Sequence, residues 1–236
     1  TRPFSKVPAK GSIPHSIFVT ATDSRPHAPD PNVVIDAEKE AFSAGVAAMS
    51  RLTDGSVFVC MNAMGAFESS IPTVKVERFE GKHPAGLAGT HIHYLDPVSA
   101  HKTVWQVNYQ DVIAIGHLFL SGQIYTPRVV SLAGPMVNHP SLVRVDRGAD
   151  LAGLTEGQVA QGQHRLISGS VLDGFTAAGA EAYLGRFHAQ VSVLEEGTHR
   201  EFLQFVMPGT DKFSLTGLFA SWVLGKKSFD LTTSTG

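Results

Sequence analysis

Apolar positions in the first half of the chain change their spacing several times. Short apolar runs predict strands at His15–Ala21, Ser56–Met61 and Thr73–Phe79. Between the first two, helical spacing predicts a helix that an Asp36 cap starts and that runs to about Leu52. The second strand is apolar throughout, as expected for a strand covered on both faces. This order of elements predicts a Rossmann-like α/β layer.

A short strand then leads into a second helix. Asn108 can cap the free amides of that helix, and Asp111 places a negative charge in its first turn. The apolar residues of Val112–Leu120 cover nearly the whole circumference, so we expect this helix to be buried rather than half exposed. Gly122 is expected to end it.

The pattern changes after residue 126. Two strands, Arg128–Ala133 and Leu142–Val145, flank a proline-bounded turn. A short helix at Ala149–Leu154 and a strand at His164–Leu172 follow. The order hairpin, helix, strand indicates a β-grasp module.

The last part of the chain is β-rich. A hairpin is predicted from His188–Leu194 and Glu201–Met207, and a short amphipathic helix from Thr216–Lys227. The sequence therefore predicts an α/β protein in three parts. These are a Rossmann-like domain at 1–126, a β-grasp domain at 127–182, and a hairpin-and-helix extension at 183–236.

The C-terminal end is rich in aromatic side chains. They are Phe213, Phe219, Trp222 and Phe229, beside Lys226–Lys227. One interpretation is the edge of a core. The other is a docking surface for another protein subunit, because apolar faces flanked by lysine suit interfaces.

Bulk composition excludes several classes of function. The chain has 236 residues with 19 Lys and Arg against 21 Asp and Glu, and no basic stripe, which argues against nucleic acid as a partner. Its one cysteine, Cys60, excludes an internal disulfide, and its apolar strand predicts a buried, inert thiol. The longest apolar run has about ten residues, against the roughly 20 that cross a bilayer.

The most specific signal is a set of long sequence words in a fixed order. They are HPAGLAGTHIHYLDPV, VNYQDVIAIG and RVVSLAGPMV in the middle, TRPFSKVPA at the start, and YLGRFHAQVSVL, PGTDKFSLT and FDLTTSTG towards the end. Together they resemble the A subunit of the bacterial sodium-translocating NADH:quinone oxidoreductases, over essentially the whole chain.

The resemblance implies a Rossmann-like domain similar to that of the NADH-binding subunit of respiratory complex I, followed by a soluble-ligand-binding (SLBB-like) β-grasp module. Members of this family are longer at both ends, and the chain begins without Met, so we expect it to be the middle of a longer polypeptide. The implied role is peripheral, on the cytoplasmic side of the bacterial inner membrane. The implied complex oxidises NADH, reduces ubiquinone and exports Na⁺, and its other subunits, including the membrane subunits, are the implied partners.

Cofactors are expected elsewhere in such a complex. One cysteine cannot hold an iron–sulfur cluster. We therefore expect FAD, FMN and Fe–S centres in partner subunits, no redox cofactor and no catalytic residue in this chain, and no catalysis by the isolated chain.

The residues that bind nucleotide in the complex I relative are largely replaced here. In that relative, the word Asn-Ala-Asp-Glu-Ser-Glu-Pro holds flavin and nicotinamide nucleotide, and the corresponding word here is Thr20–Pro26 (TATDSRP). Asp23 survives as an acid, whereas Arg25 reverses a charge. Thr1–Lys6, where a phosphate loop would lie, contains no glycine. Pro84–Thr90 is Gly-rich, but it lacks the frame of a phosphate loop and predicts a tight strand-to-helix turn.

If the chain contacts quinone, the vacated pocket is the expected place, because open α/β sheets bind ligands at a topological switch. An aromatic side chain can stack on the quinone ring, and Lys or Arg can donate to its carbonyl oxygens. The expected quinone-proximal residues are Phe4, Lys6 and Val7 below, with Thr22, Asp23 and Arg25 above. A role as scaffold alone stays open.

Two other classes of function remain as alternatives. One is a flavin- and NADH-binding dehydrogenase domain that retains its site, against which the glycine-free start argues. The other is a β-grasp module for a soluble ligand without a redox role, against which the attached Rossmann-like half argues.

Histidines raise the question of a metal site. His91 and His93 are two residues apart, with His83 and His101 nearby and Asp96 as the single close acid. On a helix, residues two apart point to different faces. We interpret these histidines as ordinary polar or core residues and predict no metal.

Overall fold

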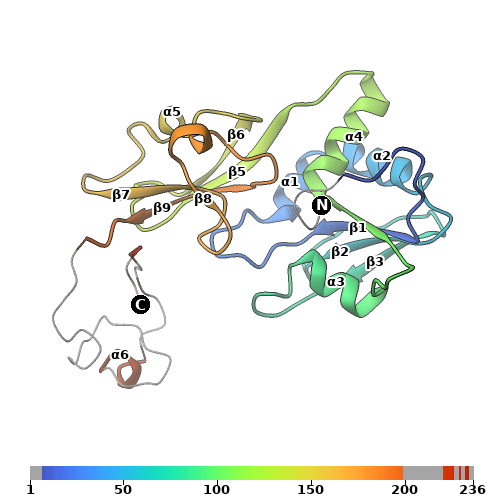
Figure 1. Cartoon of the computed structure of the whole chain (residues 1–236), viewed down its shortest axis with the longest axis horizontal. Helices are drawn as coiled ribbons and strands as arrows, with labels where there is room; N and C mark the ends of the chain where they lie inside the picture. The colour runs from blue at the N-terminus through green and yellow to red at the C-terminus, as the bar shows by residue number, and fades with distance from the viewer. Residues whose placement is uncertain (1–6, 199–219, 226–228, 230–231, 234–236) are drawn as a thin grey trace. The chain divides into compact units, whose positions relative to one another are not determined.

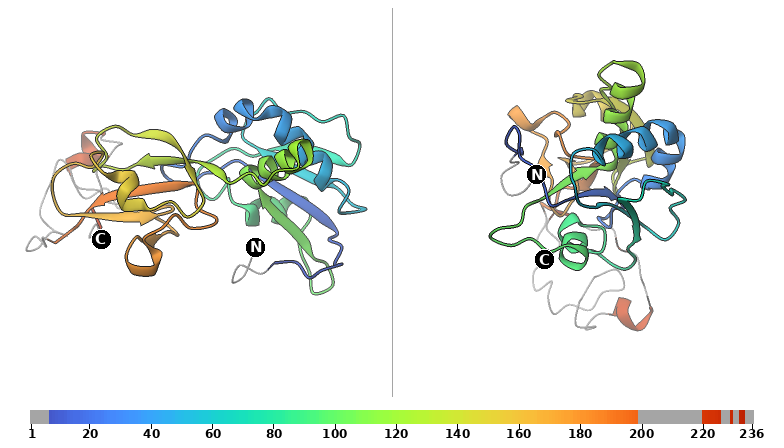
Figure 2. Two further views of the ribbon diagram at one scale, coloured as in Figure 1. Left: turned by 90° about the horizontal axis from the view of Figure 1, so that it is seen from above. Right: turned by 90° about the vertical axis from the view of Figure 1, so that its right-hand side faces the viewer.

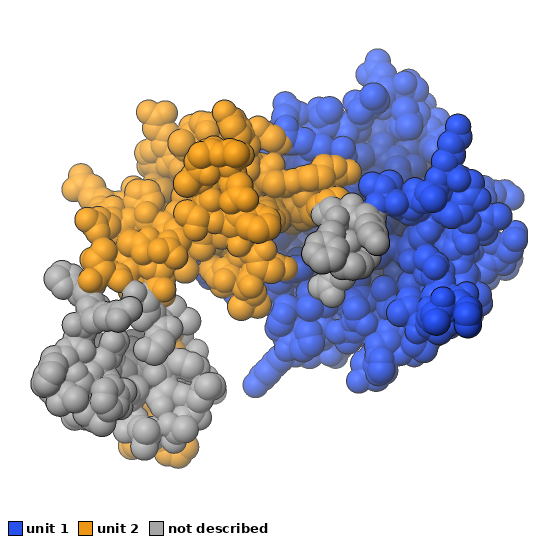
Figure 3. Space-filling view, viewed as in Figure 1, with its two compact units in different colours: residues 1–130, 142–147 blue, residues 131–141, 148–236 orange. Residues whose placement is uncertain are grey.

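The computed structural model describes residues 7–198, 220–225, 229 and 232–233. The chain divides into two compact units, which Figure 3 distinguishes by colour. Unit 1 comprises residues 1–130 and 142–147, and unit 2 comprises residues 131–141 and 148–236.

Unit 1 is built on a parallel sheet of four strands. They are β1 (Ser16–Ala21), β2 (Val57–Met61), β3 (Val74–Arg78) and β4 (Val104–Asn108), in the order β3-β2-β1-β4. The predicted α/β layer is confirmed. Because β2 and β3 lie on one side of β1 and β4 on the other, the order of strands reverses between β1 and β4, the position at which such sheets bind ligands.

Helices cover both faces of this sheet (Figures 1 and 2). On one face lie α1 (Pro31–Ala37), α2 (Lys39–Met49) and α4 (Tyr109–Ser121), which pack on a large apolar core. On the other face α3 (Ala88–Leu95) covers a smaller core of Phe18, Phe58 and Cys60. Both cores are apolar because β1 and β2 are buried along their whole length.

The first helix begins earlier than its sequence pattern predicts. Asp30, rather than Asp36, is the cap, and its carboxylate accepts a hydrogen bond from the Asn32 amide at 3.0 Å. Pro31 then occupies the first turn, where its missing N–H costs nothing. The helix ends at Ala37, and α2 restarts after Glu38, so the Asp36 prediction is wrong.

The start and end of α4 are confirmed. Asn108 accepts a hydrogen bond from the Gln110 amide at 2.9 Å, and Gly122 adopts a φ of 71° as the C-cap. The Gln110 side chain also bonds both backbone groups of Val129, donating to the carbonyl at 2.7 Å and accepting from the amide at 2.9 Å. That pair of bonds joins the start of α4 to strand β5 (Pro127–Ala133).

Helices α2 and α4 touch through their backbones. A Cβ placed on Gly45 would lie 2.0 Å from the Val112 carbonyl oxygen, and one on Gly116 would lie 1.7 Å from that of Ala41. Only glycine permits these contacts. The two helices run antiparallel, because Ala41, the earlier of the two contacts in α2, meets Gly116, the later of the two in α4.

The expectation that α4 is buried throughout is wrong. Val112, Ile113 and Gly116 are buried, but the last turn is not. Gly116 already meets Ala41 near the start of α2, so α4 continues past the end of its neighbour. The apolar pattern of α4 therefore continues beyond the residues that other elements of unit 1 bury.

The second sheet is mixed and has five strands. They are β5, β6 (Ser141–Asp146), β7 (His164–Ser168), β8 (Phe175–Thr176) and β9 (Gln190–Glu195), in the order β6-β5-β9-β7-β8. β9 runs parallel to β5 and antiparallel to β7. β5 and β9, the first and last of these strands, lie side by side, as in a β-grasp fold. β9 falls in the segment that the sequence assigns to the extension at 183–236, so this sheet includes a strand beyond the predicted range of 127–182.

The remaining elements of this part are short. Helix α5 (Leu151–Thr155) begins at Asp150, whose carboxylate accepts from the Gly153 amide at 2.8 Å. β7 stops at Ser168, before the predicted Leu172, because Gly169 adopts a φ of 100°. A 3₁₀ turn precedes β9, and α6 (Ala220–Val223) lies within the predicted amphipathic helix. The predicted strand at 201–207 lies outside the described residues.

We expect Gly116→Ala to destabilise the protein by about 2 kcal/mol. The new methyl group would overlap the Ala41 carbonyl oxygen, and relieving that overlap requires a helix to shift, which costs about 1–3 kcal/mol. The higher helix propensity of alanine offsets up to about 1 kcal/mol of this cost. Thermal unfolding measures the change.

The control is Gly122→Ala, which meets no atom within 4 Å but must hold a left-handed backbone. Its cost is about 1 kcal/mol. If Gly116→Ala lowers the melting temperature no more than this control, the backbone contact between α2 and α4 does not exist.

Candidate functional site: a groove beside α3 and β4

A groove of about 670 Å³ runs along the face of the unit 1 sheet that α3 covers. α3 forms one wall, the outermost strand β4 forms the floor, and the segment at Val7 borders it. The lining residues are mostly apolar: Val7, Pro8, Ala88, Gly89, Ile92, His93, Pro97, Val98, Thr103, Val104, Trp105 and Gln106. Its volume is in the range of small-ligand sites, about 300–1,000 Å³.

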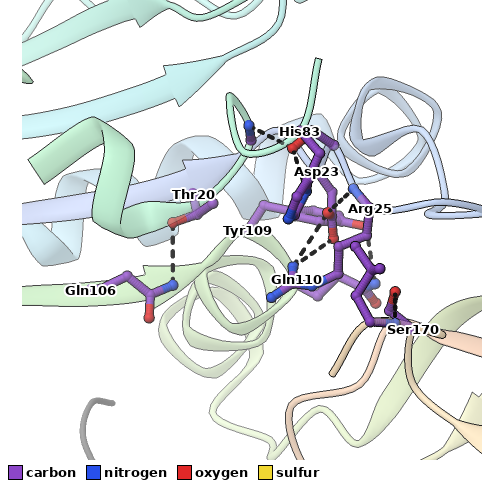
Figure 4. A network of polar contacts seen from close by, with 11 residues as sticks. Thr20, Asp23, Arg25, His83, Gln106, Tyr109, Gln110 and Ser170 are labelled. Carbon is purple, nitrogen blue, oxygen red and sulfur yellow. Dashed lines mark hydrogen bonds and ion pairs between the residues drawn. The ribbon is translucent and has the colours of Figure 1, made fainter. Parts of the chain in front are cut away.

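A few polar groups face this groove. Gln106 lies on β4, and its amide donates to the Thr20 hydroxyl of β1 at 3.2 Å (Figure 4). His93 is exposed on α3, with its ring 5.2 Å from that of Tyr94. An amide and an imidazole can both donate to a carbonyl oxygen. The groove thus offers hydrogen-bond donors within an apolar surface, beside the β1–β4 switch.

Asp96 holds the wall of the groove in place. It follows α3, and its carboxylate accepts from the Ser16 hydroxyl at 2.6 Å and from Lys102 Nζ at 2.5 Å, and bonds His15 Nδ1 at 2.8 Å. Burial alone would raise the pKa of this carboxyl, but the bonds from Lys102, Ser16 and His15 outweigh it and lower the pKa to about 2. The next residue in the chain, Pro97, lines the groove.

The loop after β1 forms its own polar cluster. Thr22 is buried, and Asp23 forms an ion pair with Arg25 at 3.2 Å while accepting from the Arg25 amide at 2.9 Å (Figure 4). Tyr109 is buried nearby; burial raises the pKa of its phenol, and the Asp23 charge adds to that rise. Both charges of the loop are therefore already engaged with each other.

The Gly-rich turn closes the carboxyl end of β1. The Gly86 amide donates to the Ser24 hydroxyl at 2.8 Å, and His83 Nδ1 lies 3.1 Å from the same oxygen. A Cβ on Gly86 would lie 2.3 Å from the Ser24 amide nitrogen. The glycine serves close packing between two loops, so its amide does not face a phosphate.

The histidines near α3 occupy different environments. His91 is fully buried, with Nε2 2.9 Å from the Ala85 carbonyl oxygen and its ring 4.2 Å from that of Phe79. Burial lowers the pKa of His91 despite that hydrogen bond. His93 is exposed, as expected two residues along a helix. Among the described residues, no three acidic, histidine or cysteine side chains gather as a metal site.

The thiol of Cys60 is buried in β2. Burial and the charge of Glu77 raise its pKa to about 12. The prediction that Cys60 is a buried core residue is confirmed, and a raised pKa favours the protonated thiol over the reactive thiolate.

The residues expected near quinone lie in two places. Val7 lines the groove, and Phe4 and Lys6 lie outside the described residues. Thr22–Arg25 forms the loop after β1 and does not line the groove. Sequence reasoning missed Gln106, although a polar residue between Trp105 and Val107 in a short strand was a usable signal.

We expect Asp96→Asn to lower the free energy of unfolding by about 2 kcal/mol at pH 7. Because folding lowers the pKa of Asp96, its carboxylate stabilises the folded protein fully above the pKa of 3.8 that it has in the unfolded chain. This stabilisation is lost as the pH falls through the folded-state pKa of about 2. Denaturant unfolding between pH 7 and pH 2 should show the two proteins converging at the acid end. Asp54→Asn, an exposed aspartate, serves as control; a constant gap across that range would contradict the ion-pair assignment.

The sequence matches two family models. The model described as the NqrA second alpha/beta domain matches residues 1–124, and that described as the NQRA C-terminal domain matches residues 129–179. Two solved chains of an NAD⁺-reducing NiFe-hydrogenase share the fold. The H₂-reduced form has a TM-score of 0.54 at 12% identity, covering 76% of this chain and 40% of that one, and the air-oxidised form has 0.52 at 14%, covering 78% and 41%.

Relatives that match along the whole chain carry the name of the A subunit of a Na(+)-translocating NADH-quinone reductase. Those of Marinomonas sp. (strain MWYL1) and Vibrio anguillarum are each 53% identical over 235 residues, and that of Pseudomonas aeruginosa is 55% identical over 236. Each match covers 100% of this chain and 53% of the relative, so the chain spans about half of their length. The chain therefore belongs to the NqrA family, the A subunits of the Na⁺-translocating NADH-quinone reductases.

Proposed function

We propose that the chain works as part of a peripheral A subunit in a complex that couples NADH oxidation and ubiquinone reduction to Na⁺ export. The names of its relatives support this role, and so does identity above 50% along the whole chain. No helix in the part of the chain that the structure describes could cross a membrane. In this proposal the chain lies on the cytoplasmic side, and the membrane subunits of the complex are its partners.

The chain acts in this proposal without a redox cofactor of its own, and FAD, FMN and Fe–S centres belong to partner subunits. Two contacts support this. The Gly86 turn packs on the loop after β1, where a dinucleotide would approach. The Asp23–Arg25 pair occupies the same edge. The likeness to the hydrogenase chains concerns the fold alone and does not carry their chemistry.

The groove beside α3 and β4 is the proposed contact for the ubiquinone ring. A quinone has a flat apolar ring with two carbonyl oxygens, which fits apolar walls with a few donors. Gln106 and His93 supply donors from the described residues, and Val7 adds apolar surface. Lys6 and Phe4 precede Val7 in the chain, and we keep them in the proposal as quinone-proximal residues. The volume and lining of the groove are the observations on which this step depends.

We expect the purified chain to be colourless. A bound flavin would absorb near about 450 nm in stoichiometric amount, and the chain should show no such band and no NADH oxidation with an artificial acceptor. Spectra before and after incubation with FAD or FMN followed by gel filtration make the measurement. A stoichiometric flavin band that survives gel filtration would refute the cofactor-free role.

We expect Gln106→Leu and Ile92→Trp in the assembled complex to raise the KM for a soluble ubiquinone analogue. The first removes a donor, at about 1 kcal/mol or roughly fivefold in KM, and the second fills the groove with a larger side chain. NADH oxidation by an artificial acceptor should stay unchanged in both. Lys6→Ala tests the preceding segment in the same assay.

The matched control is Gln161→Leu, which makes the same change at an exposed position before β7. It should leave both activities unchanged. If the two groove variants leave the KM for quinone within twofold of the parent, this unit acts as scaffold and the quinone contact lies elsewhere.

A further inference from the structure

The C-terminal end of α4 exposes a run of large apolar side chains. Leu118, Phe119, Leu120 and Ile124 are exposed by 44%, 70%, 51% and 82%, and we call these four residues the α4 tip. Single exposed apolar residues are ordinary, but a contiguous group marks an interaction site.

The packing of the helix pair creates this tip. Gly116 meets Ala41, which lies two residues after the start of α2 at Lys39. The next residue of α4, His117, bonds the Glu38 carboxylate at 2.9 Å, and beyond it the helix continues for another turn. That turn lies past the end of α2.

The sequence of α4 is that of a helix covered on all sides. Its apolar residues surround the axis from Val112 to Leu120, although a surface helix normally carries one apolar stripe. The first half of the helix meets this pattern with buried side chains. The second half carries the same pattern without a cover in unit 1, which indicates that a further element packs there.

The absence of charged residues at the α4 tip favours a protein partner over a membrane surface. No Lys, Arg, Asp or Glu lies between Val112 and Pro127, so the tip and the turn after it carry no formal charge. Membrane-surface helices combine apolar residues with Lys and Arg that attract anionic lipid. An uncharged apolar tip instead fits an uncharged hollow on a protein.

The small area of the α4 tip favours a partner segment in the same polypeptide over a separate protein. Four side chains supply a few hundred Å², whereas a free-standing interface needs about 800 Å² per partner. A segment of the same polypeptide needs less, because its tether supplies a high effective concentration. The relatives hold nearly as many residues outside the matched stretch as within it, since 235 residues make up 53% of their length.

We propose that the α4 tip docks into an apolar hollow formed by the part of the A subunit that lies outside this chain. The contact is intramolecular in the complete polypeptide and fixes that outlying part against unit 1. It rests on family membership and is independent of the quinone contact.

The test is thiol labelling with a maleimide in the complete A subunit, purified without its partner subunits. Cysteines outside this chain are replaced by serine, and Cys60 stays because its thiol is buried. We expect a Phe119→Cys thiol to react at least about tenfold more slowly in the complete polypeptide than in the present chain. Arg51→Cys, an exposed position at the far end of α2, should react equally fast in both.

Hydrogen–deuterium exchange of the unsubstituted proteins gives a second readout that needs no change at the tip. The amides of 118–124 should exchange more slowly in the complete polypeptide than in the present chain. Equal rates by both methods overturn the proposal. Protection that needs partner subunits or phosphatidylcholine vesicles also overturns it, as does protection already present in this chain, which would assign the cover to unit 2.

Discussion

The backbone contact between α2 and α4 is the constraint on which the layout of unit 1 depends. Side chains normally keep helix axes about 8–10 Å apart, but Gly45 and Gly116 let carbonyl groups lie where a methyl group would otherwise stand. The contact sets how far one helix slides along the other. It therefore sets how much of α4 is covered, where His117 meets Glu38, and how far the apolar last turn projects.

A second close approach closes the usual ligand edge of the sheet. Gly86 packs on the loop that follows β1, and the Asp23–Arg25 pair satisfies the charges there. Space for a ligand remains on the face that α3 covers, because one helix is too narrow to fill the sheet out to its last strand. Asp96 ties the end of α3 to β1 through Ser16 and to the segment before β4 through Lys102, and the next residue, Pro97, lines that space.

Sequence patterns predicted the features that local physics decides. The strands of unit 1 and the caps of α4 at Asn108 and Gly122 follow from hydrophobic spacing and cap chemistry. The Asp36 cap was wrong because two aspartates compete, and Pro31 after Asp30 decides between them. The exposure of the end of α4 could not be predicted, since hydrophobic spacing shows what a helix needs to bury and not which neighbours it has. The groove escaped prediction although most of its lining comes from residues 88–106, because hydrophobic spacing does not show how α3 is placed against β4.

Glycine shows why function has to be argued from contacts. The chain shares its fold with hydrogenase chains at 12–14% identity, and that likeness alone does not carry their chemistry. A Gly-rich word near a strand end is compatible with phosphate binding and with tight packing. The Gly86 amide donates to the Ser24 hydroxyl at 2.8 Å, which favours tight packing over phosphate binding. A backbone N–H already bonded inside the protein is not available to a ligand. The same fold thus supports different chemistry, depending on whether the loops at the strand ends pack against each other or leave room for a ligand.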